Sequence, residues 1–305
     1  MNTSLWLALA LLLAPFSAKP SPNIAVSITP FYALVAAIIK NTDTPEPILL
    51  VKPGASPHQY ALRPSDLQAL NHADIVLWAG PEYETFLKRP LDNLKAERPH
   101  LKVIAFESIP HLIRLPMRQG IHWELDHDHH HHHDMDMHFW LDPENAILMA
   151  ETIVQQLSVL DPAQASHYQQ NGKDLKVALQ ALNKRLHTQL KPFRNIPFIV
   201  FHDAYQYFQY RYGLSIVGSI TLHPEAPPSA KRIAEIRSTI FKTKAKCVFS
   251  EPQFQPKLVE SLIDDLNIHS GELDPIGNED EKNADGYFML LNRLANSITQ
   301  CLKNP

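Results

Sequence analysis

Short apolar runs alternate with helix-period patterns along most of the chain. In the first half, near-continuous apolar runs predict buried strands at 24–28, 48–51, 74–80 and 102–106. In the second half, similar runs predict strands at 198–201, 214–219, 247–250 and 268–273. Helical patterns separate them, for example at 31–39 and 63–71. Apolar strands that alternate with helices are typical of parallel sheets covered on both faces, so the pattern predicts an α/β protein with two lobes.

A long helical pattern lies between the two halves. Five leucines recur at helical spacing before Pro192: Leu175, Leu179, Leu182, Leu186 and Leu190. Asp161 and Pro162 are residue types that begin helices, so we predict one linking helix over 161–192 in which Gly172 marks a bend. A helix of about 30 residues is roughly 45 Å long and can join two lobes stiffly. The lobes are then expected at 23–160 and 193–305.

The chain begins with an apolar segment. The run from Leu5 to Leu13 is followed by small residues at Ser17 and Ala18. The run is shorter than the roughly 20 residues that cross a membrane, and it is typical of a secretory signal. We predict a signal peptide at 1–22, cleaved near 18–22, and a soluble exported protein without direct membrane insertion. The alternative, a buried N-terminal helix, would have no polar face.

Composition and charge narrow the class of protein. The 305 residues are 45% hydrophobic, with a net charge of −4 and no Lys/Arg cluster, which argues against nucleic-acid binding. The two cysteines, Cys247 and Cys301, are either a disulfide or two separate buried thiols. A bridge would close a loop of roughly 55 residues. Neither cysteine has a close second cysteine, so thiolate metal ligation is not expected.

The stretch "HWELDHDHHHHHDMDMHFWLDP" (122–143) holds eight of the chain's 17 histidines. Acids are interleaved with the histidines, and no apolar neighbours anchor the central run. We interpret 122–137, including Asp136, as a solvated loop that binds metal weakly, because a tight site needs ligands fixed by structure. Its candidate ligands are His127, His129, His130, His131, His132 and His133. His138 differs, because the apolar residues 139–141 follow it directly.

Titratable residues follow several predicted strands, where ligands of parallel sheets bind. His58 lies in the loop after 48–51, and His202 comes directly after 198–201. Glu251 and Asp274 follow the last two predicted strands. Each has an ordinary alternative: a histidine satisfied by the local backbone, or a carboxylate that caps a turn.

Six motifs extend the argument from single residues to a family. They lie in order between Ile24 and Cys301: "PGASPHQYALRPSD", "ADIVLWAGPEYETFL", "HFWLDPENAILMAETIV", "FHDAYQYF", "EPQFQP" and "GELDPIG". With these motifs and its histidine-rich loop, the sequence resembles the periplasmic zinc-binding proteins of bacterial zinc-uptake ABC transporters, the ZnuA type. The wider cluster also holds manganese-binding relatives and adhesin lipoproteins. The resemblance implies two α/β lobes joined by one long helix, with metal in the cleft between them.

The resemblance also implies a ligand set. His58, His138 and His202 match the three imidazole ligands of Zn²⁺. Manganese-binding relatives have a glutamate at the position of His202, and imidazole there favours zinc. Pro57 stands where some zinc-binding relatives have a glutamate ligand.

The fourth position is open. Asp274 matches a carboxylate that binds metal in the manganese branch; here it binds directly, accepts a bond from a ligand histidine, or leaves the position to water or a loop histidine. Glu251 is a candidate to orient a ligand ring. The family also supports the Cys247–Cys301 bridge.

The function expected from this resemblance is that of a monomeric periplasmic receptor without enzymatic activity. It would pass Zn²⁺ to a membrane permease driven by an ATPase, with the histidine-rich loop as an accessory binder. The alternative interpretation of the histidine-rich loop is a tolerated surface insertion without a role in zinc binding. Alternatives for the protein are a manganese- or iron-binding member, a zinc buffer without a transporter, and a His₃ zinc enzyme. The sequence contains no HExxH or GxSxG motif, which argues against the zinc enzyme.

Overall fold

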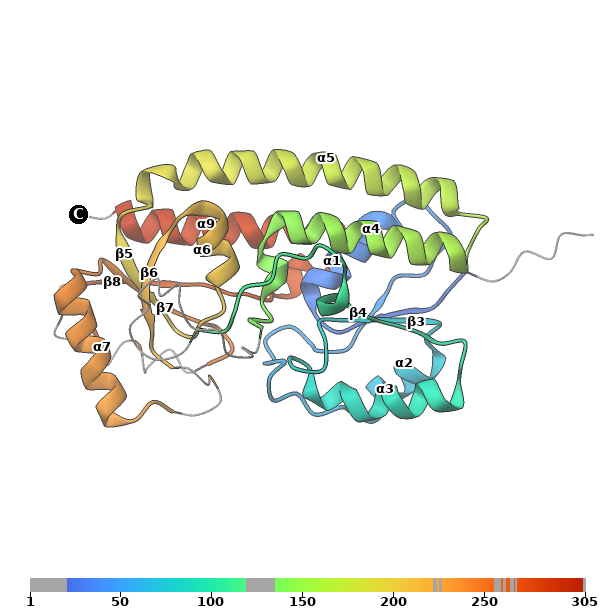
Figure 1. Ribbon diagram of the computed structural model, residues 1–305, viewed down its shortest axis with the longest axis horizontal. Coiled ribbons are helices and arrows are strands. Elements are labelled where there is room, and N and C mark those ends of the chain that lie inside the picture. The colour runs from blue at the N-terminus through green and yellow to red at the C-terminus, as the bar shows by residue number, and fades with distance from the viewer. Residues whose placement is uncertain are drawn as a thin grey trace, which may run out of the picture.

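Two parallel sheets form the framework of the protein (Figure 1). The computed structural model describes residues 21–118, 135–221, 224, 227–254, 259, 262–263, 266 and 268–303. The first sheet has the order β2-β1-β3-β4, with β1 (Ile24–Val26), β2 (Ile48–Leu49), β3 (Ile75–Trp78) and β4 (Lys102–Ala105). The second has the order β6-β5-β7-β8, with β5 (Pro197–Val200), β6 (Ser215–Ser219), β7 (Cys247–Ser250) and β8 (His269–Glu272). Both sheets are parallel throughout, which confirms the predicted fold class.

Helices cover both faces of each sheet. The N-terminal lobe contains α1 (Thr29–Ile38), α2 (Pro64–His72), α3 (Thr85–Glu97) and α4 (Pro143–Leu160). The C-terminal lobe contains α6 (Gln206–Tyr212), α7 (Ala230–Thr243) and α9 (Gly286–Lys303). Short 3₁₀ turns lie at Phe106–Ser108, Phe139–Leu141, Lys191–Phe193 and Glu279–Glu281. None of the helices in the described part of the chain has the length and apolar character needed to cross a membrane.

Alternate residues of each strand face different cores. In β3, Ile75 and Leu77 belong to a large core that also contains the leucines of the linking helix. Val76 and Trp78 belong to a separate core under α2 and α3. In the C-terminal lobe, Ile199 and Val248 join a third core with α7. The period-2 geometry of a strand explains this division, and the largest core runs continuously through both lobes.

The linking helix α5 (Ala165–Leu190) has 26 residues and passes along both lobes (Figure 1). Its start corrects one expectation: Asp161 ends α4, because its backbone N–H donates to the carbonyl of Leu157 at 2.8 Å. Gly172 lies inside α5 without interrupting it. A Cβ atom there would lie 2.5 Å from the Val154 side chain, so this glycine permits the close approach of α5 to α4.

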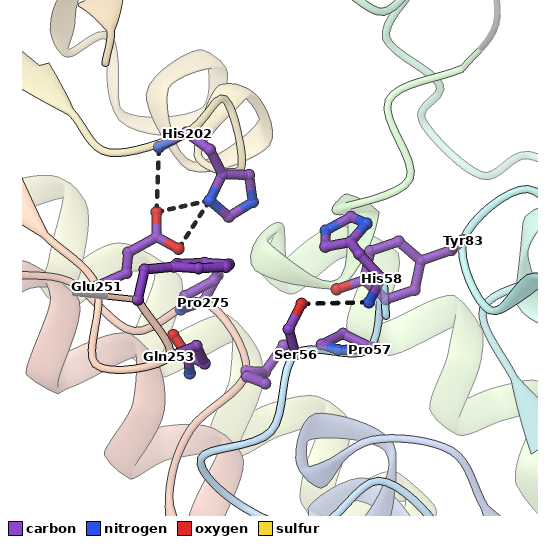
Figure 2. A pocket seen from close by; sticks show the side chains of 10 residues that line it. Ser56, Pro57, His58, Tyr83, His202, Glu251, Gln253 and Pro275 are labelled. Atoms are coloured by element: carbon purple, nitrogen blue, oxygen red, sulfur yellow. Dashed lines mark hydrogen bonds and ion pairs between the residues drawn. The ribbon is translucent and has the colours of Figure 1, made fainter. Parts of the chain in front are cut away.

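Specific polar contacts join the lobes beside this helix. The indole Nε1 of Trp140 donates to the carbonyl of Pro275 at 2.8 Å, and the hydroxyl of Tyr287 donates to the carbonyl of Trp140 at 2.6 Å. The guanidinium of Arg211 binds both carboxylate oxygens of Asp142, at 2.8 and 2.7 Å. These contacts hold the carboxyl ends of the two sheets near one another, around a pocket lined by His58 and His202 (Figure 2).

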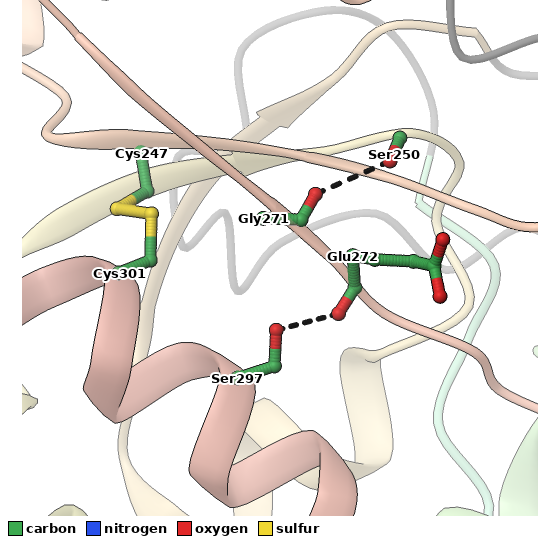
Figure 3. The surroundings of a disulfide bond; sticks show 6 residues. All are labelled: Cys247, Ser250, Gly271, Glu272, Ser297 and Cys301. Carbon is green, nitrogen blue, oxygen red and sulfur yellow. Dashed lines mark hydrogen bonds between the residues drawn. A yellow bond between two sulfur atoms is a disulfide. The ribbon is translucent and has the colours of Figure 1, made fainter.

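The predicted disulfide is confirmed. Cys247 on β7 is bonded to Cys301 on α9, with a sequence separation of 54 residues (Figure 3). Both cysteines belong to the large core and are nearly fully buried.

Replacing both cysteines by serine is expected to lower the free energy of unfolding by about 4 kcal/mol, because the open chain regains the entropy of a long loop. Urea denaturation of the double variant and the oxidised wild type measures this difference. A loss below about 1 kcal/mol would contradict it, since loop closure would then contribute little.

Candidate metal centre

Three histidines reach the pocket from different elements. His58 lies in the loop after β2, and its backbone N–H donates to the hydroxyl of Ser56 at 3.3 Å. His138 directly precedes the 3₁₀ turn Phe139–Leu141, which anchors it in the large core. His202 follows β5 after one intervening residue. His58 and His202 approach from opposite sides of the pocket in Figure 2. The expected ligands therefore meet, although they are 64 or more residues apart in sequence.

The spacing of these histidines suits a single metal ion. Each offers a ring nitrogen, and the three nitrogens all lie within 4.8 Å of one another. The Nε2 atoms of His138 and His202 are 3.4 Å apart. Two nitrogens bound at about 2.05 Å to a tetrahedral Zn²⁺ are separated by about 3.3 Å. The pair His138 and His202 is therefore already at ligand spacing, and both side chains are nearly fully buried.

A carboxylate lies behind each member of this pair. The Nδ1 atom of His138 is 2.8 Å from Oδ1 of Asp136, and Nδ1 of His202 is 2.7 Å from the carboxylate of Glu251. A carboxylate at Nδ1 holds the proton on that nitrogen and leaves the Nε2 lone pair free for a metal. The two carboxylates thus fix both the tautomer and the aim of the two rings.

Burial controls the protonation of the pair. It holds the pKa of His138 well below its usual value, with a further decrease from the neighbouring His202. Burial also lowers the pKa of His202, but Glu251 outweighs this effect and the net pKa is raised. Burial raises the pKa of Asp136 to about 7. A proton on the Nε2 atom of either ring would face the other ring at 3.4 Å, so protonation of one imidazole disfavours protonation of the other.

Aromatic rings form the wall of the site in the N-terminal lobe. The ring of Tyr83 packs edge-on against His58 at 4.7 Å and against His138 at 5.4 Å between centroids. Trp140 lies 5.0 Å from Tyr83 and 5.3 Å from His138. These ring contacts limit rotation of the two histidines and give the site an apolar wall, where electrostatic interactions are stronger than in water.

The two predicted carboxylates in the C-terminal lobe have different partners, and Glu251 is the one that contacts the ring of His202. Among the described residues, the group of metal-binding side chains is His58, His138 and His202, without Asp274. Oδ1 of Asp274 accepts hydrogen bonds from Gln253 Nε2 at 2.8 Å and from the backbone N–H groups of Ile276 and Gly277, each at 3.0 Å. This carboxylate therefore holds the turn after β8 that carries the Pro275 carbonyl.

Asp136 is the residue that sequence reasoning missed. We expected it to be solvated with the rest of the histidine-rich loop, and that expectation is wrong: only 4% of it is exposed. The signal in the sequence was its place two residues before His138, from which a short side chain can reach back to that ring. The accessory ligands at 127 and 129–133 lie outside the described residues.

Comparisons with known proteins find relatives that match most of the chain. The family described as "ZnuA: Zinc-uptake complex component A periplasmic" matches residues 24–301. The chain is 40% identical to the high-affinity zinc uptake system protein ZnuA of Brucella abortus (strain 2308), over 92% of this chain and 91% of that one. It is 39% identical to the protein of the same name from Yersinia pestis, over 97% and 96%. A crystal structure of ZnuA superposes with a TM-score of 0.76 at 27% identity, covering 92% of this chain and 99% of that one.

Proposed function

The chain belongs to the ZnuA family of periplasmic zinc-uptake components, and from this premise we propose that His58, His138 and His202 hold Zn²⁺ as the cargo of an importer. The protein is the periplasmic binding component of an ABC-type zinc importer, and it acts in transport rather than catalysis. The observation that carries the ligand assignment is the 3.4 Å separation of the His138 and His202 Nε2 atoms in a buried pocket.

The chemistry of the donors favours zinc. Three neutral imidazoles form one of the ordinary ligand sets for this ion, and a glutamate in place of one of them would suit manganese better. Glu251 and Asp136, behind two of the rings, supply two negative charges once the metal is bound. These charges equal that of a divalent cation, so the loaded site is close to neutral although it is buried.

Zinc selectivity tests this proposal. The purified mature protein is expected to retain one zinc ion per cleft when manganese is present in excess. Elemental analysis after dialysis gives the metal content, and competition with a chromophoric chelator gives the affinity. A parallel sample lacks the histidine-rich loop, so that the measured metal content is that of the cleft alone. Retention of manganese or iron in place of zinc would favour a receptor for those metals.

We propose that the fourth coordination position is open to water and that Asp274 supports the site rather than binding the metal. Three backbone and side-chain donors already engage its Oδ1 atom.

Asp274→Ala is therefore expected to weaken zinc binding by about 10- to 100-fold, the usual effect of losing a residue outside the ligand shell. The chelator competition measures this loss beside that of His138→Ala. An equal loss in both variants would instead make Asp274 a ligand.

We further propose a route by which the protein delivers zinc. Removal of residues 1–22 would release the mature protein into the periplasm as a monomer, organised as lobes at 23–160 and 193–305 with the linking segment 161–192 between them. Zinc would pass from the cleft to a permease with its ATPase, and the loop histidines would bind zinc weakly. Loss of growth under zinc chelation when the gene is deleted, with no rescue by the His138→Ala variant, would support this route; rescue by that variant would contradict it.

A further inference from the structure

The two segments that flank the histidine-rich stretch pair with each other at their bases. We call residues 113–118 and 135–138 the stem. Pro116 and Met135 form an antiparallel bridge, and the backbone N–H of Asp136 donates to the carbonyl of Leu115 at 2.9 Å. The segment after β4 thus crosses from the N-terminal lobe toward α6 of the other lobe (Figure 1).

The hydroxyl of Tyr207 joins both halves of the stem to α6. It accepts a hydrogen bond from the backbone N–H of Leu115 at 2.9 Å and donates to the carbonyl of Asp136 at 2.8 Å. Tyr207 is fully buried, and its hydrogen bond to the Asp136 carbonyl is buried as well, so water does not easily replace that bond. One side chain of the C-terminal lobe therefore fixes the position of Asp136 in the N-terminal lobe.

Asp136 transmits this position to a metal-binding ring. Its Oδ1 atom accepts from the backbone N–H of His138 at 3.0 Å and contacts Nδ1 of the same residue at 2.8 Å. With backbone and ring held by the same oxygen, the imidazole has little freedom to rotate. Its Nε2 atom then faces His202 at 3.4 Å.

The segment 202–207, which contains Tyr207, also contains one of the proposed zinc ligands. His202 lies two residues after the end of β5, and Tyr207 lies five residues further along the chain, in α6. A second contact joins this segment to the stem, because Arg118 Nε donates to Oδ2 of Asp203 at 2.8 Å. The segment 202–207 thus supplies the ligand His202, and it also holds Asp136, the residue that contacts the ligand His138.

We propose that Tyr207 is a positioning residue for zinc: through Asp136 it places His138 at ligand distance from His202. This inference rests on the proposed function of the cleft. A purely structural Tyr207 would only satisfy two backbone groups, so its loss would lower stability and leave the ligand geometry unchanged. The positioning role and the purely structural role therefore predict different metal affinities and different coordination geometries when Tyr207 is changed.

The test is Tyr207→Phe in the full mature chain, with two controls on the same helix. Tyr210→Phe removes an exposed hydroxyl, and Tyr212→Phe removes a buried one that has no hydrogen-bond partner among the described residues. Chelator competition measures zinc affinity, the visible spectrum of bound Co²⁺ reports coordination geometry, and thermal unfolding without metal reports stability. Tyr207→Phe is expected to weaken zinc binding by about tenfold or more and to alter the Co²⁺ spectrum, while both controls match the wild type.

The outcomes separate the possible failures. A wild type without a tight zinc site would overturn the proposed function itself. A tight wild type with an unchanged Co²⁺ spectrum and affinity in Tyr207→Phe would overturn only the positioning role. If Tyr207→Phe does not fold, Asp136→Asn and Asp136→Ala decide. Asp136→Asn keeps the oxygen acceptor for His138 and should retain the wild-type Co²⁺ spectrum, whereas Asp136→Ala should have an altered spectrum. Identical spectra in both variants would contradict the positioning of His138 through Asp136.

Discussion

His202→Ala is expected to abolish tight zinc binding, with a loss of affinity well above about 100-fold. Loss of an outer partner alone typically costs 10- to 100-fold in metal affinity, and His202 is a proposed ligand. The variant also leaves the carboxylate of Glu251, which is 1% exposed, without the ring that it contacts at 2.7 Å. Calorimetry with Zn²⁺ measures both the affinity and the number of sites.

Two further forms identify which histidines make the tight site. A deletion of 127–134 should keep one tight site and lose only weak binding, and the deletion combined with His202→Ala should lose both. His167→Ala, at an exposed position on α5, is the matched control and should behave as the wild type. If the deletion instead removed tight binding while His202→Ala kept it, the histidine-rich stretch would be the receptor site and the cleft assignment would be wrong.

The strands could be predicted because their sequence signal is local. "CVFS" is a short run with three apolar residues, and β7 has those bounds. The start of α5 could not be predicted in this way. Asp161 and Pro162 are a normal beginning for a helix, yet they lie in the turn that ends α4. Two helices that pack as a hairpin compete for the same residues, and local propensity does not say which helix takes them.

The site shows the same limit at the level of side chains. The position of His202 after a buried strand marked it as a candidate, and the family resemblance joined it to His58 and His138. Asp136 shares its composition with the acidic stretch before it, so charge patterning placed it in solvent. Its backbone carbonyl accepts a hydrogen bond from the hydroxyl of Tyr207, a residue 71 positions away. A contact over that separation leaves no periodic trace in the sequence.

Trp140→Ala is expected to lower the free energy of unfolding by about 3–5 kcal/mol, the usual cost of removing a buried aromatic ring. Trp140 is fully buried, and its ring packs against Phe31 at 5.8 Å as well as Tyr83 and His138. Denaturant unfolding of the metal-free protein measures this loss. Zinc affinity should fall in the same variant, because the ring supports His138 from one side.

The hydrogen bond from Trp140 to Pro275 can be separated from the packing of the ring. Trp140→Phe keeps most of the ring and removes only the donor to the Pro275 carbonyl. Trp78→Phe is the matched control: Trp78 is also buried, but its Nε1 has no partner among the described residues, and it lies in the core under α2 and α3. Both substitutions remove a similar area of aromatic ring. The difference between their losses of unfolding free energy therefore reports the hydrogen bond between the lobes.

Trp140→Phe is expected to be the more destabilising of the two by about 1–3 kcal/mol, because it leaves a buried carbonyl without its donor. It should also weaken zinc binding, since Pro275 directly follows Asp274 and the turn that they share borders the pocket. Trp78→Phe should leave zinc affinity unchanged. Equal losses of stability and affinity in the two phenylalanine variants would mean that the bond between the lobes contributes nothing specific. The spacing of His138 and His202 would then depend on the stem, the linking helix and the ion pair of Arg211 with Asp142.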